Sequence, residues 1–502
     1  MTSSASDDAA HNARTSSKAE TRIVVIGAVS IALYILIYYV QRSIFYNGVS
    51  SHSPGGDLGL PTSGANLIWQ MSAYAVVTIA LFAAYRAVLS MCAQGQLGRG
   101  RAVILALAVP CVMNLVLVVG RPWLSQDVFS YMAHGFLGVT PGSNPFLQPA
   151  EAAADSTLGS SLAAYGWHGE IGITPYGIVW TWIEKTVMWL SGENLSLALW
   201  LFKSIVVAAS LGTAFCIWSF LGRTRPSSQL LGTLAYLWNP MILAEFAGEG
   251  HNDALIVFFV IAALAACAAG RSTASMVAQM LGILSKYISL MFCPAQLVFL
   301  WRTRRGVIRL ALEIAAALAI TGTVAAILYA PLWAGSHTFD GLLRRGQPIS
   351  SASPFGAINW ILRRSPLAPA AALLTLACVT LPLLAFAAWA SLRVKDAVDL
   401  GRAFAWISLA YVLVASPDYW PWYACMPVTL IIVADTDRLL WLALLMSFTA
   451  RLCAPLDLIR DHGFLGMIVA KGALTGLGAS LPLAVLLLWL YRRRPGWLNF
   501  TP

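Results

Sequence analysis

Residues 102–135, AVILALAVPCVMNLVLVVGRPWLSQDVFSYMAHG, decide the fold, because an uncharged apolar run passes directly into a polar segment. Residues 102–120 reach the length of about 20 apolar residues that crosses a bilayer as a helix. Residues 121–135 are amphipathic and too short to span, so we expect a helix lying along the membrane surface. The stretch therefore predicts a membrane protein with polar groups gathered at the end of a span.

The composition extends this prediction to the whole chain of 502 residues. Hydrophobic residues make up 58% and charged residues 11%, whereas a soluble domain carries about 25% charged residues. The mean hydropathy is +0.71. A chain of several soluble domains is excluded. The net charge of +10 comes from basic residues spread over many short loops, so no nucleic-acid partner is expected.

The predicted fold is an all-α, polytopic transmembrane helical bundle of about 12–14 membrane segments with no separate soluble domain. A disordered tail over 1–22 precedes a single membrane domain over 23–491, and a basic tail follows over 492–502. Residues 274–301 form two short apolar pieces broken at Ser285-Lys286-Tyr287, which predicts a helical hairpin. Spans are expected near 23–40, 67–85, 102–120, 198–221, 229–246, 254–270, 307–330, 367–392, 403–416, 420–434, 439–453 and 464–491.

The distribution of basic residues predicts the sides of the membrane. With both termini in the cytoplasm, most Lys and Arg residues fall in cytoplasmic loops, as the positive-inside rule requires. The two large polar segments, 121–197 and 331–366, then face outward. No phosphate-binding G-x-x-x-x-G-K-[ST] loop occurs. We expect a multi-pass protein of the cytoplasmic membrane whose chemistry lies on the outer face, where a substrate must be membrane-borne or already exported.

Asp127, Tyr131 and His134 are spaced to share one face of the short outer helix. A carboxylate fixed there can act as a general base toward a hydroxyl, with the other two side chains orienting it or a sugar. The alternative is structural, because Ser125 or Asp127 could cap the helix that starts at this point.

A second acidic constellation runs from Glu245 to Asp253 at an outer turn between two spans. Its members Glu249, His251, Asn252 and Asp253 are costly at membrane depth without partners, so they are candidates for substrate binding. Asn252 or Asp253 could instead cap the following helix. The sequence requires no cofactor. It leaves open a divalent cation at Asp127, Glu249, His251 or Asp253, although the spacing is no metal signature.

Cationic residues supply candidates for a phosphate site. Lys286 interrupts the predicted hairpin, and burying it without an anion would be expensive. Arg344 and Arg345 lie in the second outer segment, as does the pair 363–364, against the positive-inside trend. Arginines bind phosphate bidentately, but an exposed pair can equally be a solvated face or a contact to lipid head groups.

Aromatic residues complete the outer rim. Tyr176 belongs to Thr174-Pro-Tyr-Gly177, and Asp418, Trp422 and Tyr423 belong to the turn between two later spans. Trp and Tyr at this level usually anchor a protein at the membrane interface. They also suit sugar binding, in which the apolar sugar face stacks on a ring while a carboxylate accepts from hydroxyls.

In order along the chain, these pieces resemble the membrane glycosyltransferases of the GT-C superfamily. Within it, the chain is similar to bacterial polyprenol-phosphate-mannose-dependent α-1,6-mannosyltransferases. The likeness rests on Gln126-Asp127-Val-Phe-Ser-Tyr131, Thr174-Pro-Tyr-Gly177, Gly250-His-Asn-Asp-Ala254, Lys286 and Pro421-Trp-Tyr423. Since many GT-C proteins carry a soluble C-terminal domain that is not expected here, a long polymeric acceptor is in doubt.

The resemblance implies an inverting transfer of a hexose, with mannose the first choice, from a polyprenyl-phosphate sugar to a hydroxyl of a glycan or glycolipid acceptor. Asp127 matches the family's base, and Lys286, Arg344 and Arg345 would bind the donor phosphate. Two alternatives stay open. The same fold could use a pentose or glucose donor, or the chain could be a transporter or lipid flippase, in which broken helices and midplane charges are common.

Overall fold

The computed structural model describes residues 3–49, 64–98, 100–167, 172–303, 306–345, 353–459 and 469–493. Within them it contains helices and turns and no strand, which confirms the predicted all-α bundle. The principal helices are α1 (Ser3–Val49), α2 (Gly64–Ala93), α3 (Arg101–Val119), α4 (Asp127–Val139), α5 (Thr157–Ala164), α6 (Ile178–Ser191), α7 (Leu195–Thr224), α8 (Gln229–Leu237), α10 (Asp253–Ala268), α11 (Ser272–Ser285), α12 (Cys293–Thr303), α13 (Val307–Tyr329), α14 (Asp340–Arg345), α15 (Pro354–Arg363), α16 (Ala371–Thr375), α17 (Leu381–Leu392), α18 (Ala397–Ala410), α19 (Cys425–Cys453) and α21 (Leu481–Arg493).

Nine helices of the described chain are long and apolar enough to cross a membrane. A tenth follows if Pro226–Leu237 and Pro240–Gly248, bent by 42°, count as one span. The predicted spans at 420–434 and 439–453 are joined in α19, which kinks at Asp435. The predicted span at 254–270 corresponds to the shorter apolar helix α10. These features explain why fewer helices pass as full spans than the apolar runs predict.

The N-terminal region differs from the expectation of a disordered tail over residues 1–22, because α1 is helical from Ser3 onward. Residues 3–22 include several alanines, and each residue added to an existing helix gains a hydrogen bond without a new nucleation cost. The apolar span at Ser17–Phe45 supplies that existing helix.

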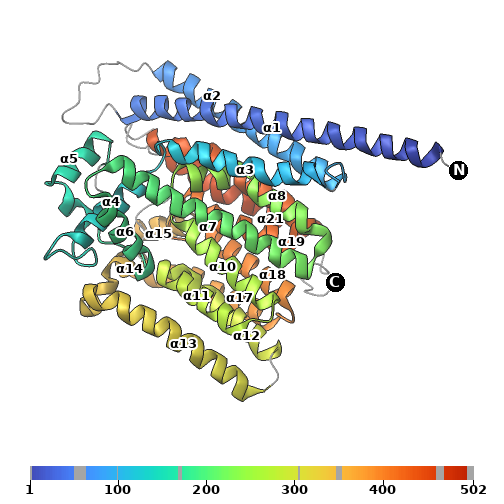
Figure 1. The fold of residues 1–502 in the computed structure, drawn as a ribbon. Coiled ribbons are helices and arrows are strands. Elements are labelled where there is room, and N and C mark those ends of the chain that lie inside the picture. Colours follow the sequence, from blue (N-terminus) through green and yellow to red (C-terminus); the bar gives the residue numbers. More distant parts are fainter. Residues whose placement is uncertain are drawn as a thin grey trace.

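The long helices lie roughly side by side, and α4, α5 and α6 gather at one end of the bundle (Figure 1). Helices α1 and α2 cover one side, and α13 lies on the opposite side. The two predicted polar segments meet at the α4–α6 end, since the Asn144 side chain donates to Leu332 O at 2.9 Å. Phe146, Ile178 and Leu332 form a small apolar core there.

The helix break predicted at Ser285-Lys286-Tyr287 is present. Helix α11 ends at Ser285, Lys286 has extended backbone angles, and a 3₁₀ turn over Tyr287–Phe292 leads into α12. The backbone N–H of Gly177 donates to Ser285 O at 2.9 Å. A Cβ atom at Gly177 would lie 2.1 Å from Leu284 O, so only glycine allows this close approach. The segment before α6 therefore packs directly against the break that carries Lys286.

Candidate active site

Asp127 is the first residue of α4, and the loop before it is held from another part of the chain. The backbone N–H groups of Leu124 and Ser125 both donate to Glu249 Oε2 at 3.1 Å. The Ser125 hydroxyl oxygen accepts from the Asp127 N–H at 3.2 Å. The Ser125 hydroxyl thus binds the first N–H of α4, while the side chain of the N-cap residue Gln126 makes no cap hydrogen bond.

Tyr131 joins the first predicted constellation to the second. Its hydroxyl lies 3.5 Å from Asp127 Oδ2 as a donor, and it accepts from the backbone N–H of Asn252 at 3.4 Å. Burial raises the pKa of Tyr131 well above its ordinary value, so the hydroxyl keeps its proton at neutral pH and can donate to a carboxylate. The structure therefore brings Asp127 close to the Glu249–Asp253 turn.

Asp253 and Lys286 form an ion pair. The Lys286 ammonium lies 3.1 Å from both carboxylate oxygens of Asp253. The side chain of Asp253 is 15% exposed and that of Lys286 is 19% exposed. Asn252 makes no side-chain cap to α10, so the capping alternative does not account for this turn. Lys286 also lies 5.9 Å and 5.3 Å from the ring centroids of Tyr176 and Tyr423. The pair is partly exposed and lies beside these two aromatic rings.

His251 faces the later aromatic turn. Its ring lies 4.0 Å from that of Trp422, which in turn stacks on Trp420 at 5.2 Å. Burial lowers the pKa of His251 well below its ordinary value, so the imidazole is neutral at physiological pH. The backbone oxygen of Asp418 accepts from the Ser416 hydroxyl at 2.5 Å, which fixes the turn. Trp422 and Tyr423 thus border the same end of the bundle as Lys286.

His134 lies away from Asp127, although both are on α4. Its Nε2 atom is 2.9 Å from Gly172 O, and its Nδ1 atom is 3.9 Å from a carboxylate oxygen of Glu184. Seven residues along an α-helix correspond to a rise of about 10 Å, which separates His134 from Asp127 even on a shared face. Burial raises the pKa of Glu184. The contacts place His134 in the packing between α4 and α6.

The predicted arginines do not provide a described phosphate site. Arg344 and Arg345 end α14, and their side chains lie outside the described part of the structure. Arg363 donates to the Asn359 side chain at 2.8 Å, and Arg364 lies 4.0 Å from the centroid of the Trp360 ring. Both partners belong to α15, so the contacts of this second pair are local.

Two buried cations of this end were not among the predicted site residues. Arg451 binds Glu245 at 2.5 Å, with side chains 3% and 2% exposed. Lys203 donates to Leu117 O at 2.7 Å and also to Gly120 O. The signal in the sequence was a cation inside an apolar run, which needs a partner at membrane depth. Within the described residues, no cluster of His, Cys, Asp and Glu side chains could hold a metal ion.

The fold and the charged end define a multi-pass helical membrane protein with a polar site at one end of its spans. Residues 50–303 match the family described as "Alpha-(1->6)-mannopyranosyltransferase, N-terminal domain". The chain belongs to this family, and the matched region contains Asp127, Asp253 and Lys286.

Named relatives agree with this assignment. A Mycobacterium tuberculosis protein named "Alpha-(1->6)-mannopyranosyltransferase A" is 27% identical over 367 residues, which cover 66% of this chain and 67% of that protein. A Corynebacterium glutamicum protein of the same name is 24% identical over 167 residues, which cover 33% of this chain and 31% of that protein. The chain thus matches two thirds of one relative and about a third of the other.

Proposed function

We propose that this protein is an inverting glycosyltransferase. It moves a hexose, mannose in the first instance, from a polyprenyl-phosphate sugar to a hydroxyl of a glycan or glycolipid on the outer face of a bacterial cytoplasmic membrane. One observation carries the proposal. Two hydrogen bonds of Tyr131, at 3.5 and 3.4 Å, and the ion pair of Asp253 connect the Asp127 carboxylate to the Lys286 ammonium through the Asn252–Asp253 turn.

This juxtaposition suits a single displacement. Asp127 takes the proton of the acceptor hydroxyl, and the hydroxyl oxygen attacks the anomeric carbon of the donor. The bond from that carbon to the phosphate oxygen breaks, and polyprenyl phosphate leaves with the electron pair. Lys286 stabilises the charge that develops on the phosphate. Since one base acts without a separate carboxylate nucleophile, the anomeric configuration inverts.

The surroundings of Lys286 support its part in this step. Its partner Asp253 is only partly enclosed, so a phosphate can approach and share the ammonium. Tyr176 and Tyr423 flank the same cation. Tyr423 is partly exposed and offers a ring to the sugar, whereas Tyr176 is buried and packs on Tyr131 behind the cation. The names of the relatives support mannose over other hexoses.

The experiment uses purified protein in lipid nanodiscs with polyprenyl-phosphate mannose, glucose or arabinose and a mannoside acceptor. Mannose should be transferred fastest, and NMR of the product should show an anomeric configuration opposite to that of the donor. Transfer from none of the three donors would overturn the proposal. Retention of configuration would refute the single displacement.

A further inference from the structure

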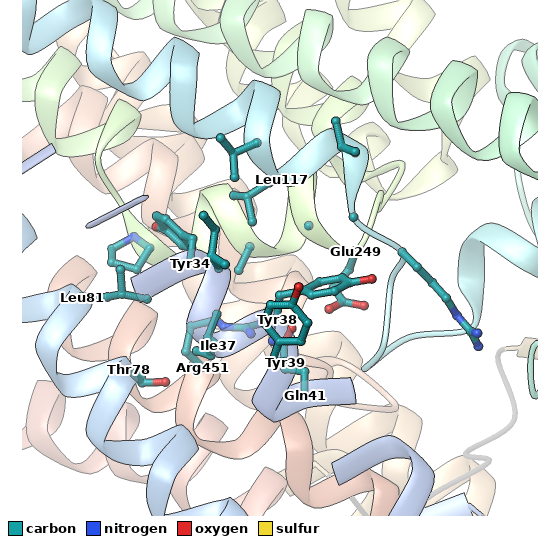
Figure 2. A pocket seen from close by; sticks show the side chains of 18 residues that line it. Tyr34, Ile37, Tyr38, Tyr39, Gln41, Thr78, Leu81, Leu117, Glu249 and Arg451 are labelled. Carbon is teal, nitrogen blue, oxygen red and sulfur yellow. The ribbon is translucent and has the colours of Figure 1, made fainter. Parts of the chain in front are cut away.

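A cavity of about 250 Å³ lies behind Glu249, on the side of α1, and it takes no part in the contacts between Asp127 and Lys286. Figure 2 shows Tyr34, Tyr38, Thr78, Glu249 and Arg451 around it. Its walls come from α1, α2, the end of α3, the bent segment before Glu249, and α19. Neither Asp253 nor Lys286 lines it. The cavity is thus a separate space at the same end of the bundle.

The mouth of the cavity faces the side of the bundle that meets lipid. Ile35, Tyr39 and Val119 are lining residues, and they are 47%, 58% and 64% exposed. They belong to α1 and α3, both of which are candidate membrane spans. An occupant would therefore enter from the bilayer, between these two helices.

The inner wall carries buried donors that lack partners in the described structure. Tyr34 is 3% exposed, and its hydroxyl has no hydrogen-bond partner among the described residues. The same holds for Nη2 of Arg451, a residue 2% exposed whose Nη1 binds Glu245. Buried donors that lack an acceptor destabilise the folded protein. An occupant that brings acceptor oxygens would remove this destabilisation.

The charges around the cavity favour an anion. The lining includes two arginines, Arg121 and Arg451, and one carboxyl, Glu249. Just behind the lining, Glu245 pairs with Arg451, and Lys203 donates to the carbonyls that end α3. The Arg121 guanidinium donates to Tyr165 O and lies over the Trp123 and Tyr165 rings. The attraction for an anion therefore comes mainly from Arg451, and protonation of Glu249 would strengthen it. The remaining lining is mainly apolar, which suits the stem of an amphiphile.

From this geometry we infer that the cavity binds the phosphate-bearing head group of an anionic membrane phospholipid, with the acyl chains left in the bilayer beside α1 and α3. The phosphate oxygens would accept from Tyr34 and Arg451. Glu249 faces the same cavity and holds the backbone of Leu124 and Ser125. A lipid bound there would therefore brace the loop that leads to Asp127, without taking part in sugar transfer.

The test is photo-crosslinking of the purified full chain with two diazirine-bearing probes, phosphatidylglycerol and phosphatidylcholine. Peptides that contain residues 34–41 and 116–121 should be labelled by phosphatidylglycerol about tenfold more than by phosphatidylcholine, as charge-assisted hydrogen bonds of about 1.5 kcal/mol or more imply. Inorganic phosphate should not displace the label, because it lacks the lipid stem. The readout requires no transfer, so its failure is distinct from failure of the glycosyltransferase proposal.

Two variants and a matched control make the test specific. A Cβ atom at Gly248, which lines the cavity, has only Leu243 O near it at 3.9 Å, so Gly248→Leu should fill the space and abolish the label. Gly322→Leu is the matched control, because Gly322 on α13 also has open space at its Cβ position. Tyr34→Phe keeps the ring and removes one donor, and the label should fall by roughly 2–10-fold.

Three outcomes would overturn the inference. Equal labelling by the two lipids would mean that the cavity is only an apolar void. Displacement by inorganic phosphate would mean a site for free anions. Labelling that Gly248→Leu and Tyr34→Phe both leave unchanged would place the lipid elsewhere on the protein.

Discussion

Two ion pairs originate from the same stretch, residues 245–253, and they differ in depth. Glu245 and Arg451 lie 2.5 Å apart with side chains 2% and 3% exposed. Asp253 and Lys286 lie 3.1 Å apart with side chains 15% and 19% exposed. The first pair joins the bent segment to α19, and the second joins the start of α10 to the break after α11.

The difference in depth separates a structural role from a substrate-binding role. Removing one partner of a fully buried pair leaves a stranded charge and costs about 3–5 kcal/mol of stability. In a partly exposed pair, the cation can exchange its carboxylate partner for a substrate phosphate. The exchange costs less than in a fully buried pair, because water can solvate the released carboxylate. We therefore expect the Glu245–Arg451 pair to stabilise the fold and the Asp253–Lys286 pair to bind the substrate phosphate.

The largest effect should come from a substitution of Asp127, whose carboxylate is connected through Tyr131 and Asn252 to the Asp253–Lys286 pair. Asp127→Asn keeps the shape of the side chain but cannot accept a proton. Transfer should fall by about 10²–10⁴-fold, the range for a general base, while donor binding survives. The measurement is the initial rate of mannose transfer by purified protein, alongside donor affinity.

The control for that substitution is Asp155→Asn, which changes an exposed aspartate in the turn before α5. It should leave the rate unchanged. A well-folded Asp127→Asn protein with full activity would exclude Asp127 as the base and move the search to Asp253.

The second prediction compares the two ion pairs directly. Lys286→Met should weaken donor use by about 2–5 kcal/mol and change the apparent melting temperature little. Arg451→Met should lower the melting temperature strongly, because it strands Glu245. Thermal unfolding in detergent and donor affinity measured on both variants give the comparison. The reverse pattern, with Lys286 controlling stability and Arg451 controlling donor use, would contradict the division of roles.

The fold could be predicted from the sequence because each apolar run reports a helix locally. The run at 102–120 corresponds to α3, and the polar interruption at Lys286 corresponds to the break between α11 and α12. The spacing of Asp127 and Tyr131 was also sufficient to predict that they share a helical face, and their side chains are in contact. Periodicity carries this information because it depends only on neighbours along the chain.

The partners of the buried charges could not be predicted in this way. Glu245 and Arg451 are 206 residues apart in sequence, and nothing local indicates which carboxylate meets which cation. The same applies to Glu249, whose partners are the backbone N–H groups of Leu124 and Ser125. Backbone donors have no sequence signature. His134 shares the predicted face but packs on another element, which periodicity along one helix cannot show.

The third prediction concerns Glu249, which lies between the deep pair and the Asp127 loop. Burial raises the pKa of Glu249 from its ordinary value of 4.5 to about 7, and the Glu245 carboxylate adds to this shift. Between these two pH values the folded protein keeps a proton that the unfolded chain has released. The free energy of unfolding should therefore fall as pH rises from about 4.5 to about 7.

Glu249→Gln isolates this effect, because an amide oxygen can still accept from Leu124 and Ser125 but does not titrate. The melting temperature of the unsubstituted protein minus that of the variant should be larger at pH 5 than at pH 8. The measurement is thermal unfolding across this range at constant ionic strength. A difference that is constant or grows with pH would show that Glu249 is ionised throughout.

The smallest effect should separate the two residues that share a helical face with Asp127. Tyr131→Phe removes the hydroxyl that bridges Asp127 and Asn252 and should slow transfer by roughly 2–10-fold, the worth of one hydrogen bond. Since the lost donor favoured the charged carboxylate, the acid limb of the pH–rate profile should also move to higher pH. His134→Gln should leave both the rate and the profile unchanged, because His134 contacts Gly172 instead. The measurement is transfer rate against pH for the three proteins at saturating donor. A shifted pH–rate profile in His134→Gln would contradict this assignment, as would an unshifted profile in Tyr131→Phe. Either result would mean that a group other than the Tyr131 hydroxyl orients the Asp127 carboxylate.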